Sequence, residues 1–281
     1  MNFLQRHLFS SQTQMHILKP IILIYLIIPS LLMAQSVGKW RAGSAYSLEG
    51  KVYTLSCFIS GPDDEWTYDE KVNVLNQLNE THAWLKKQAS AYQIKLTFEG
   101  GNFGLEKDIK LKKIERGTAS GNERTDLVSE VFKKIGYKSP LDYYDWVKEN
   151  TKSKNTHVIL FAKGKGNGYA MPSSTEMNKK LYFTEGAILY EKYLGNEPLA
   201  SSSIAHEILH LYGAWDLYKT YAQPKSREDK AKKIYPNSIM LRTSYDFDEL
   251  EVDELTAWLI GWNKSPKSSF EWFRPSDTPA E

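Results

Sequence analysis

The stretch from residue 203 to residue 216, SIAHEILHLYGAWD, limits the possible folds of this chain more than any other. It places His206 and His210 four residues apart among apolar residues, and residues with that spacing share one face of an α-helix. Two imidazoles on one face can bind one metal ion, and Glu207, beside the first, can accept a proton from water at that ion. Gly213 suits a helix end because glycine tolerates the left-handed conformation. The segment therefore predicts a helix that carries a metal site.

A zinc site with an open catalytic position needs three protein ligands, and the helix supplies two. Gly213 lets the chain leave the helix, and three residues later Asp216 can turn back toward the metal. A carboxylate oxygen is an accepted zinc ligand. We therefore expect one Zn²⁺ ion held by His206, His210 and Asp216. The alternative is an ordinary buried helix with hydrogen-bonded histidines, and a capping or solvated role for the aspartate.

The pattern HExxHxxGxxD over residues 206–216 resembles the metzincin clan of zinc endopeptidases, whose third ligand is His or, in a minority of members, Asp. Metzincins also carry a methionine in a tight turn beneath the metal. Met240, which ends the turn-forming sequence YPNSIM, resembles that residue. The resemblance rests on residues 203–240. It implies an α/β (α+β) fold in which helices pack on a twisted mixed sheet and the zinc-binding helix lies below the cleft.

The resemblance implies an endopeptidase that hydrolyses peptide bonds in protein or peptide substrates, with Glu207 as general base. Tyr245, which follows the methionine turn, would lend its phenol to the oxyanion, as tyrosines near that turn do in some related enzymes; the alternative is a packing role. An edge strand before the zinc helix pairs with the substrate backbone in metzincins, and we expect Gly168, Tyr169 and Ala170 to fill that role. A plain surface loop is the alternative there.

Two other functions remain open at this stage. In the gluzincin clan the third ligand is a glutamate on a later helix, and Glu251 and Glu254 are available in this chain. The spacing of Asp216 favours the metzincin type. The chain could also be a zinc-stabilised protein that binds peptides without cleaving them. Glu207 argues against that reading, because a structural zinc site has no use for a free base beside it.

Residues 1–34 are typical of a signal peptide. Basic residues precede a thirteen-residue apolar run at 21–33, and no acidic residue occurs before Gln35. The run is short for a membrane span, although a retained N-terminal anchor is the alternative. We expect a product that is secreted, periplasmic or bound at the cell surface, without membrane contact after cleavage. Residues 35–281 would then form a single zinc peptidase domain.

Composition excludes some classes of function. Removing residues 1–34 removes Arg6 and Lys19 and leaves 34 basic and 34 acidic side chains, a balance that does not favour a nucleic-acid partner. The single cysteine, Cys57, lies in an apolar run and excludes an internal disulfide. We therefore expect a monomer that depends on its core and its metal rather than on cross-links.

Periodicity predicts the remaining elements. We expect strands at 51–59, 94–98, 157–161 and 181–190, and helices at 75–89, 125–135, 140–150 and 248–262. One exposed strand is expected within 109–114, a surface excursion at 217–233 and a frayed tail from residue 264. His82 lies on the apolar stripe of its helix and His157 begins an apolar strand, so both are interpreted as structural rather than as ligands.

Overall fold

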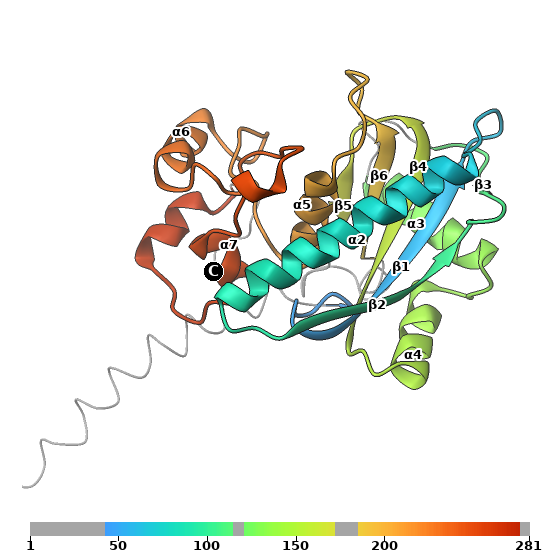
Figure 1. Ribbon diagram of the computed structural model, residues 1–281, viewed down its shortest axis with the longest axis horizontal. Coiled ribbons are helices and arrows are strands. Elements are labelled where there is room, and N and C mark those ends of the chain that lie inside the picture. The colour runs from blue at the N-terminus through green and yellow to red at the C-terminus, as the bar shows by residue number, and fades with distance from the viewer. Residues whose placement is uncertain (1–42, 115–120, 172–184, 276–281) are drawn as a thin grey trace, which may run out of the picture. The chain divides into compact units, whose positions relative to one another are not determined.

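The computed structural model describes residues 43–114, 121–171 and 185–275, and its strands form one mixed sheet (Figure 1). The strands are β1 (Gly50–Ser60), β2 (Leu96–Phe103), β3 (Ile109–Lys110), β4 (Asn155–Lys165), β5 (Tyr169–Met171) and β6 (Gly186–Lys192). Their order is β2-β1-β4-β6-β5, and β3 pairs with the end of β1. All pairings are parallel except that of β5 with β6. The predicted mixed α/β fold is confirmed.

Helices flank the sheet and continue beyond it. They are α2 (Tyr68–Ala91), α3 (Gly121–Lys134), α4 (Pro140–Asn150), α5 (Ser201–Leu211), α6 (Lys225–Ile234) and α7 (Glu254–Leu259), with 3-10 helices η1 (Phe247–Glu249) and η2 (Ser268–Phe273). Among the described residues, no helix is both long and apolar enough to cross a membrane. The predicted cleavage point at residue 34 and the first part of the strand predicted at 181–190 lie outside the described residues.

The central strands are buried on both faces, as parallel strands covered by helices usually are. In β4, Ile159 and Phe161 belong to the core shared with α2 and α5, whereas Val158, Leu160 and Ala162 belong to the core shared with α3 and α4. This alternation follows from the two-residue period of a strand. The sheet is therefore a wall with one helical layer on each face.

The long helix α2 fixes the start of α5. Thr67 and Glu70 form a capping box at its N-terminus, which satisfies backbone N–H groups there. Farther along, Thr81 Oγ1 donates to the carbonyl of Ser201 at 2.8 Å, and Gln77 Nε2 donates to the carbonyl of Leu199 at 2.7 Å. The two helices lie beside each other in Figure 1. Because α2 packs on the sheet, these hydrogen bonds hold the start of α5 in a fixed position relative to the sheet.

The C-terminal part differs from the prediction. The helix predicted at 248–262 is interrupted, because Asp253 caps a new helix by accepting from the N–H groups of Leu255 and Thr256. The tail predicted to be frayed forms η2, whose Phe270 and Phe273 are buried. These two aromatic side chains are buried by residues from other parts of the chain, so no local sequence pattern predicts their burial.

Two further segments also differ. The surface excursion predicted at 217–233 contains α6, and the exposed strand predicted within 109–114 is reduced to β3, with Leu111 and Ile114 buried behind it. His157 is fully buried, which fits the structural role predicted for it, and Cys57 is fully buried as well.

Candidate metal centre

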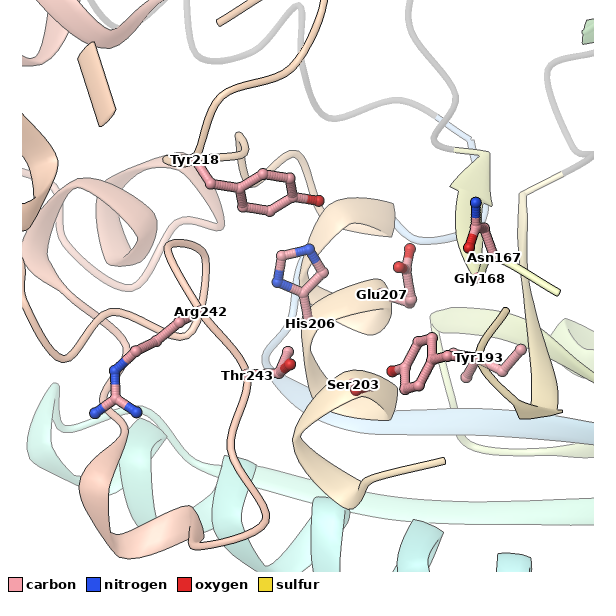
Figure 2. A pocket seen from close by; sticks show the side chains of 10 residues that line it. Asn167, Gly168, Tyr193, Ser203, His206, Glu207, Tyr218, Arg242 and Thr243 are labelled. Atoms are coloured by element: carbon pink, nitrogen blue, oxygen red, sulfur yellow. The ribbon is translucent and has the colours of Figure 1, made fainter. Parts of the chain in front are cut away.

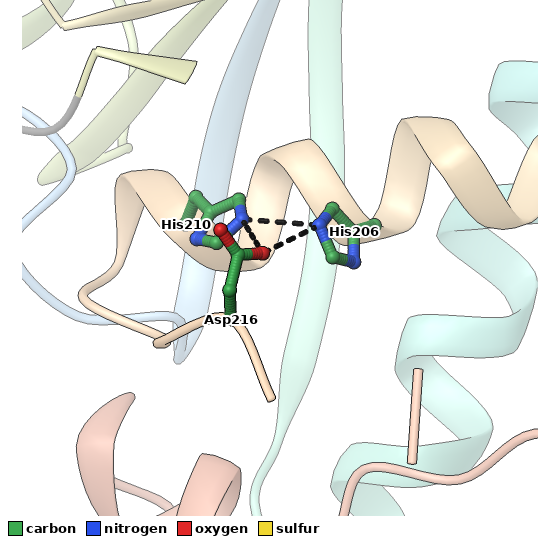
Figure 3. Close-up of side chains that lie close together, drawn as sticks. All are labelled: His206, His210 and Asp216. Carbon is green, nitrogen blue, oxygen red and sulfur yellow. Dashed lines mark hydrogen bonds and ion pairs between the residues drawn. The ribbon is translucent and has the colours of Figure 1, made fainter. Parts of the chain in front are cut away.

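The helix α5 presents His206 and His210 on one face, and their Nε2 atoms lie 3.0 Å apart (Figure 3). The helix ends at Leu211 with Tyr212 as its C-cap, and Gly213 follows with φ +98°, a conformation that favours glycine. The chain then turns back. Asp216 Oδ1 lies 3.0 Å from His210 Nε2 and 3.3 Å from His206 Nε2. The structure thus brings together the three predicted ligands, which form a group suited to one metal ion.

Backbone contacts decide which nitrogen of each ring faces the centre. His206 Nδ1 lies 2.9 Å from the carbonyl oxygen of Ile239, and His210 Nδ1 lies 2.8 Å from that of Ala214. A carbonyl oxygen only accepts, so each Nδ1 carries the hydrogen, and a ring in its neutral form turns an unprotonated Nε2 inward. Two lone pairs and a carboxylate oxygen therefore face one point, where they repel one another unless a cation lies among them.

The separations suit a zinc ion. Ligand atoms about 2.0–2.1 Å from a tetrahedral zinc stand about 3.3 Å from each other. The distances from Asp216 to the two imidazoles, 3.0 and 3.3 Å, are near that value. The donor set of two imidazole nitrogens and one carboxylate oxygen is one that zinc accepts in catalytic sites. The residues present therefore fit the metal that the sequence predicts.

The pKa shifts of His210 and Asp216 also indicate that the cluster favours a bound positive charge. Burial alone would lower the pKa of His210, but the charge of Asp216 and its hydrogen bond outweigh burial and raise that pKa to about 9. Burial alone would raise the pKa of Asp216, but His210 and His206 hold it well below the usual range for a carboxyl group. The cluster therefore holds positive charge, either a proton or a metal ion.

Glu207 lies in a pocket of about 320 Å³ that His206 also lines (Figure 2). Burial raises the pKa of Glu207; the neighbouring histidines oppose that shift and Asp216 adds to it. Gly168 forms the opposite wall, where a Cβ atom would lie 3.7 Å from Glu207 Oε1. A carboxylate with a raised pKa beside a metal site is suited to accept a proton from water and return it.

Tyr218, which sequence reasoning missed, also lines this pocket. Its ring stacks on His206 with centroids 6.0 Å apart, and its hydroxyl shares a hydrogen bond with Asp216. Burial of the hydroxyl, followed by the charges of Asp216 and Glu207, raises the pKa of Tyr218. Its position two residues after the third ligand was the one available signal in the sequence.

The predicted catalytic residue Tyr245 lies elsewhere. Its side chain is 67% exposed and its hydroxyl donates to the carbonyl of Pro198 at 2.8 Å. It lines an adjoining pocket of about 370 Å³, which Glu207 does not line. Of the two tyrosines, the structure therefore brings Tyr218 rather than Tyr245 to the metal ligands.

The predicted methionine turn supports both ligand segments. Met240 is fully buried, and its carbonyl accepts from the N–H of Leu217, next to Asp216, at 2.8 Å. The preceding residue, Ile239, supplies the carbonyl that orients His206. The turn therefore holds the first and third ligands in position through its backbone.

The remaining predicted residues separate into two groups. Gly168, Tyr169 and Ala170 stand at the β5 edge of the sheet, with Tyr169 and Ala170 paired antiparallel to β6. By contrast, Glu254 binds Lys267 and receives a hydrogen bond from Tyr235, and its carboxylate does not belong to the metal-binding group found among the described residues; nor does that of Glu251. The gluzincin alternative therefore finds no support in this part of the chain.

Comparison with known proteins adds a similarity to solved structures. No protein-family model matches the chain, and no curated protein matches it. The crystal structure of metalloproteinase-II from Bacteroides fragilis matches with 14% sequence identity and a TM-score of 0.34, over 76% of this chain and 53% of that one. The chain thus spans about half the length of that protein. At this level of similarity, the chemistry of the chain has to be judged from its own site.

Proposed function

We propose that this chain is a zinc-dependent endopeptidase of the metzincin type that acts after export. One observation carries the proposal. His206, His210 and Asp216 direct three electron-pair donors at one point, and Glu207 lies beside them in an accessible pocket. A purely structural zinc site would be closed and would not need the free carboxylate.

The chemistry follows from the positions of the side chains. Zinc, when bound, would supply a Lewis acid that polarises a peptide carbonyl and acidifies water. Glu207 accepts a proton from the attacking water and then delivers it to the leaving amine, a role that suits its raised pKa. Tyr218 lines the same pocket, and its hydroxyl, which donates to Asp216 in this structure, would turn to donate toward the oxyanion that develops on the peptide carbonyl.

The sheet edge provides a way to orient a peptide. In the strand order of the described residues, β5 is terminal and pairs on one side with β6. A peptide that adds to an open strand edge gains main-chain hydrogen bonds without depending on its side chains. Gly168, just before β5, faces Glu207, so a peptide bound along this edge would pass the catalytic carboxylate. This arrangement supports an extended polypeptide as substrate.

The direct test is Glu207→Gln. The amide keeps the shape of the side chain but cannot accept a proton, so we expect zinc to remain bound at one ion per chain while kcat falls by about 10²–10⁴-fold. Zinc content and cleavage of casein and of a peptide library measure the two effects. Glu197→Gln is the matched control, because that exposed carboxylate lies in the adjoining pocket and should leave both quantities unchanged.

Chelation completes the test. Removal of zinc should abolish wild-type cleavage, and adding zinc back should restore it. Cleavage by Glu207→Gln at the wild-type rate would refute the assigned role of the carboxylate. Zinc-bound wild-type protein that cleaves no member of the library would instead favour a zinc-stabilised peptide-binding protein.

A further inference from the structure

A second concave surface lies away from the metal centre, where the chain enters β1, β2 and β4. It is a groove of about 880 Å³, larger than the pocket that contains Glu207. Its walls come from residues 43–51, 93–95 and 152–155, together with Tyr144 of α4. None of these residues takes part in the proposed catalysis. The groove therefore calls for an explanation of its own.

The groove is strongly basic. Lys51, Lys95, Lys152 and Lys154 line it, against Glu49 as the one acidic lining residue. Lys51 forms an ion pair with Glu99, but among the described residues the other three lysines have no carboxylate oxygen within 4.0 Å. Four lysines thus stand against two carboxylates, those of Glu49 and Glu99, so the groove carries net positive charge. Like charges gathered around one concavity attract an anionic ligand and increase its rate of association.

The walls of the groove are held in place by contacts within the fold. Ser47 N donates to Asn155 Oδ1 at 3.0 Å, and Thr156 N donates to the carbonyl of Ser44 at 2.9 Å. These bonds tie the segment before β1 to the start of β4. Tyr46 adds a ring that is 53% exposed and lines the groove. A preformed surface of this kind loses little conformational freedom when a ligand binds.

We propose that this groove is an exosite that binds an acidic segment of a polypeptide and thereby recruits protein substrates. That recruitment rests on the proposed peptidase function; binding itself does not. The lysine ammonium groups of the lining are point charges on flexible stems that can follow the spaced carboxylates of a peptide, and the exposed ring of Tyr46 offers an apolar surface for its side chains. The chain just before Gly43 contains Lys39 and Arg41 and no acid, so it does not match the groove in charge.

Binding is tested in full-length Glu207→Gln protein, so that the peptide is not consumed. A fluorescent peptide that alternates Glu and Gly is titrated at low and at physiological ionic strength. We expect salt-sensitive binding that weakens by about tenfold or more when Lys95, Lys152 and Lys154 are all changed to Glu. The matched control changes Lys107, Lys112 and Lys233 to Glu, an equal change of charge at exposed positions outside the groove.

The outcomes separate specific binding from a general effect of charge. Intact binding in the control, with loss in the groove variant and an unchanged melting temperature in both, supports the exosite. The exosite is overturned if both lysine variants lose peptide binding equally, or if the Glu207→Gln protein with an unaltered groove does not bind the peptide. A sulfated polysaccharide or an oligonucleotide that binds the groove much more tightly than the peptide also overturns the assignment to polypeptides.

Recruitment is tested with otherwise wild-type protein and two substrates that share a cleavage sequence. One carries an acidic tail and the other a neutral tail. We expect the acidic tail to lower KM by about fivefold or more, and expect the groove variant to lose this advantage while it cleaves the neutral substrate normally. An identical KM for both substrates in wild-type protein overturns recruitment. Because peptide binding is measured without catalysis, failure of the exosite and failure of the peptidase are distinguishable.

Discussion

At the scale of single residues, His206 and His210 are oriented through the ring nitrogen that faces away from the centre. The carbonyl groups of Ile239 and Ala214 fix the tautomer of each ring, so that both inner nitrogens are ready to bind a metal. The sequence predicts the three donors from their spacing alone. It does not predict their orienting carbonyls, because any residue provides one and Ile239 lies 33 positions from His206.

The sequence likewise does not predict which tyrosine lies beside the metal ligands. The chain has 17 tyrosines, and spacing does not say which ring a loop turns toward a pocket. Tyr245 was the candidate by analogy, yet its hydroxyl is bound to the carbonyl of Pro198. Tyr218 reaches the site because the chain turns back after Gly213 and carries its ring onto His206. The tertiary course of the chain, and not the local sequence, therefore determines which tyrosine lies at the site.

Tyr218→Phe tests this selection. Loss of one hydroxyl aimed at a developing oxyanion should lower kcat by about 10²-fold with little change in KM, because the interaction strengthens only in the transition state. Zinc content measured at saturating zinc should be unchanged, whereas zinc affinity should fall because the hydroxyl of Tyr218 donates to Asp216. Steady-state kinetics on a cleaved peptide provide the measurement, with Tyr245→Phe as the control that stays near wild type. The opposite result, with kcat lost only in Tyr245→Phe, would return the role to the residue favoured by sequence analogy.

At the scale of elements, periodicity predicts the long helix α2 and the buried strands but not the short C-terminal pieces. The helix α6 has one buried residue, Ala231, and is supported by ion pairs such as Lys232 with Glu228. A helix with one buried residue has no apolar stripe to detect. Similarly, the ring of Phe270 in η2 packs on that of Trp258, with centroids 5.3 Å apart, and this contact lies outside any local period of the sequence.

The cap of α7 connects this region to the metal site. Asp253 Oδ1 accepts from the backbone at the start of α7, while Oδ2 accepts from the hydroxyl groups of Ser238 and Thr256, each at 2.6 Å. Ser238 Oγ in turn accepts from the N–H of Met240 at 3.1 Å. One buried carboxylate thus joins a helix terminus to the turn that orients His206.

The substitution Asp253→Asn separates the role of this carboxylate as a helix cap from its role in supporting the turn at Met240. The amide keeps an acceptor for the helix cap but offers an N–H₂ group where two hydroxyls donate. We expect a loss of about 1–3 kcal/mol of unfolding free energy and a zinc affinity lower by about tenfold or more. Urea denaturation and chelator competition measure these quantities. Asp246→Asn, at the exposed cap of η1, is the control. Zinc affinity within about twofold of wild type would show that the turn holds its position without this carboxylate.

At the scale of the whole molecule, a buried polar chain crosses the sheet toward the metal-site helix. Thr54 Oγ1 on β1 lies 3.3 Å from His82 Nε2 on α2 and 3.0 Å from His157 Nε2 on β4. His157 Nδ1 lies 3.0 Å from the hydroxyl of Tyr212, the C-cap residue of α5. The two histidines predicted to be structural therefore join both helices to the sheet, and burial disfavours the protonated form of each.

The pH dependence of stability follows from His157. Burial first, and the nearby His82 second, lower the pKa of His157 to about 3, against about 6.5 in an unfolded chain. Between these values the unfolded chain binds a proton that the folded protein does not, so stability is complete above about pH 6.5 and declines as pH falls toward 3. From pH 7 to pH 5 this imidazole alone should lower the free energy of unfolding by up to about 2 kcal/mol.

The measurement is urea unfolding from pH 5 to pH 8 in the presence of a chelator, which removes metal release as a second cause. His157→Gln, which keeps a hydrogen-bonding side chain but does not titrate, should be less stable than wild type at pH 7 yet lose less stability on acidification. Parallel curves for the two proteins would mean that acid acts on the fold elsewhere, and the polar chain through Thr54 would then be a packing feature without a part in pH dependence.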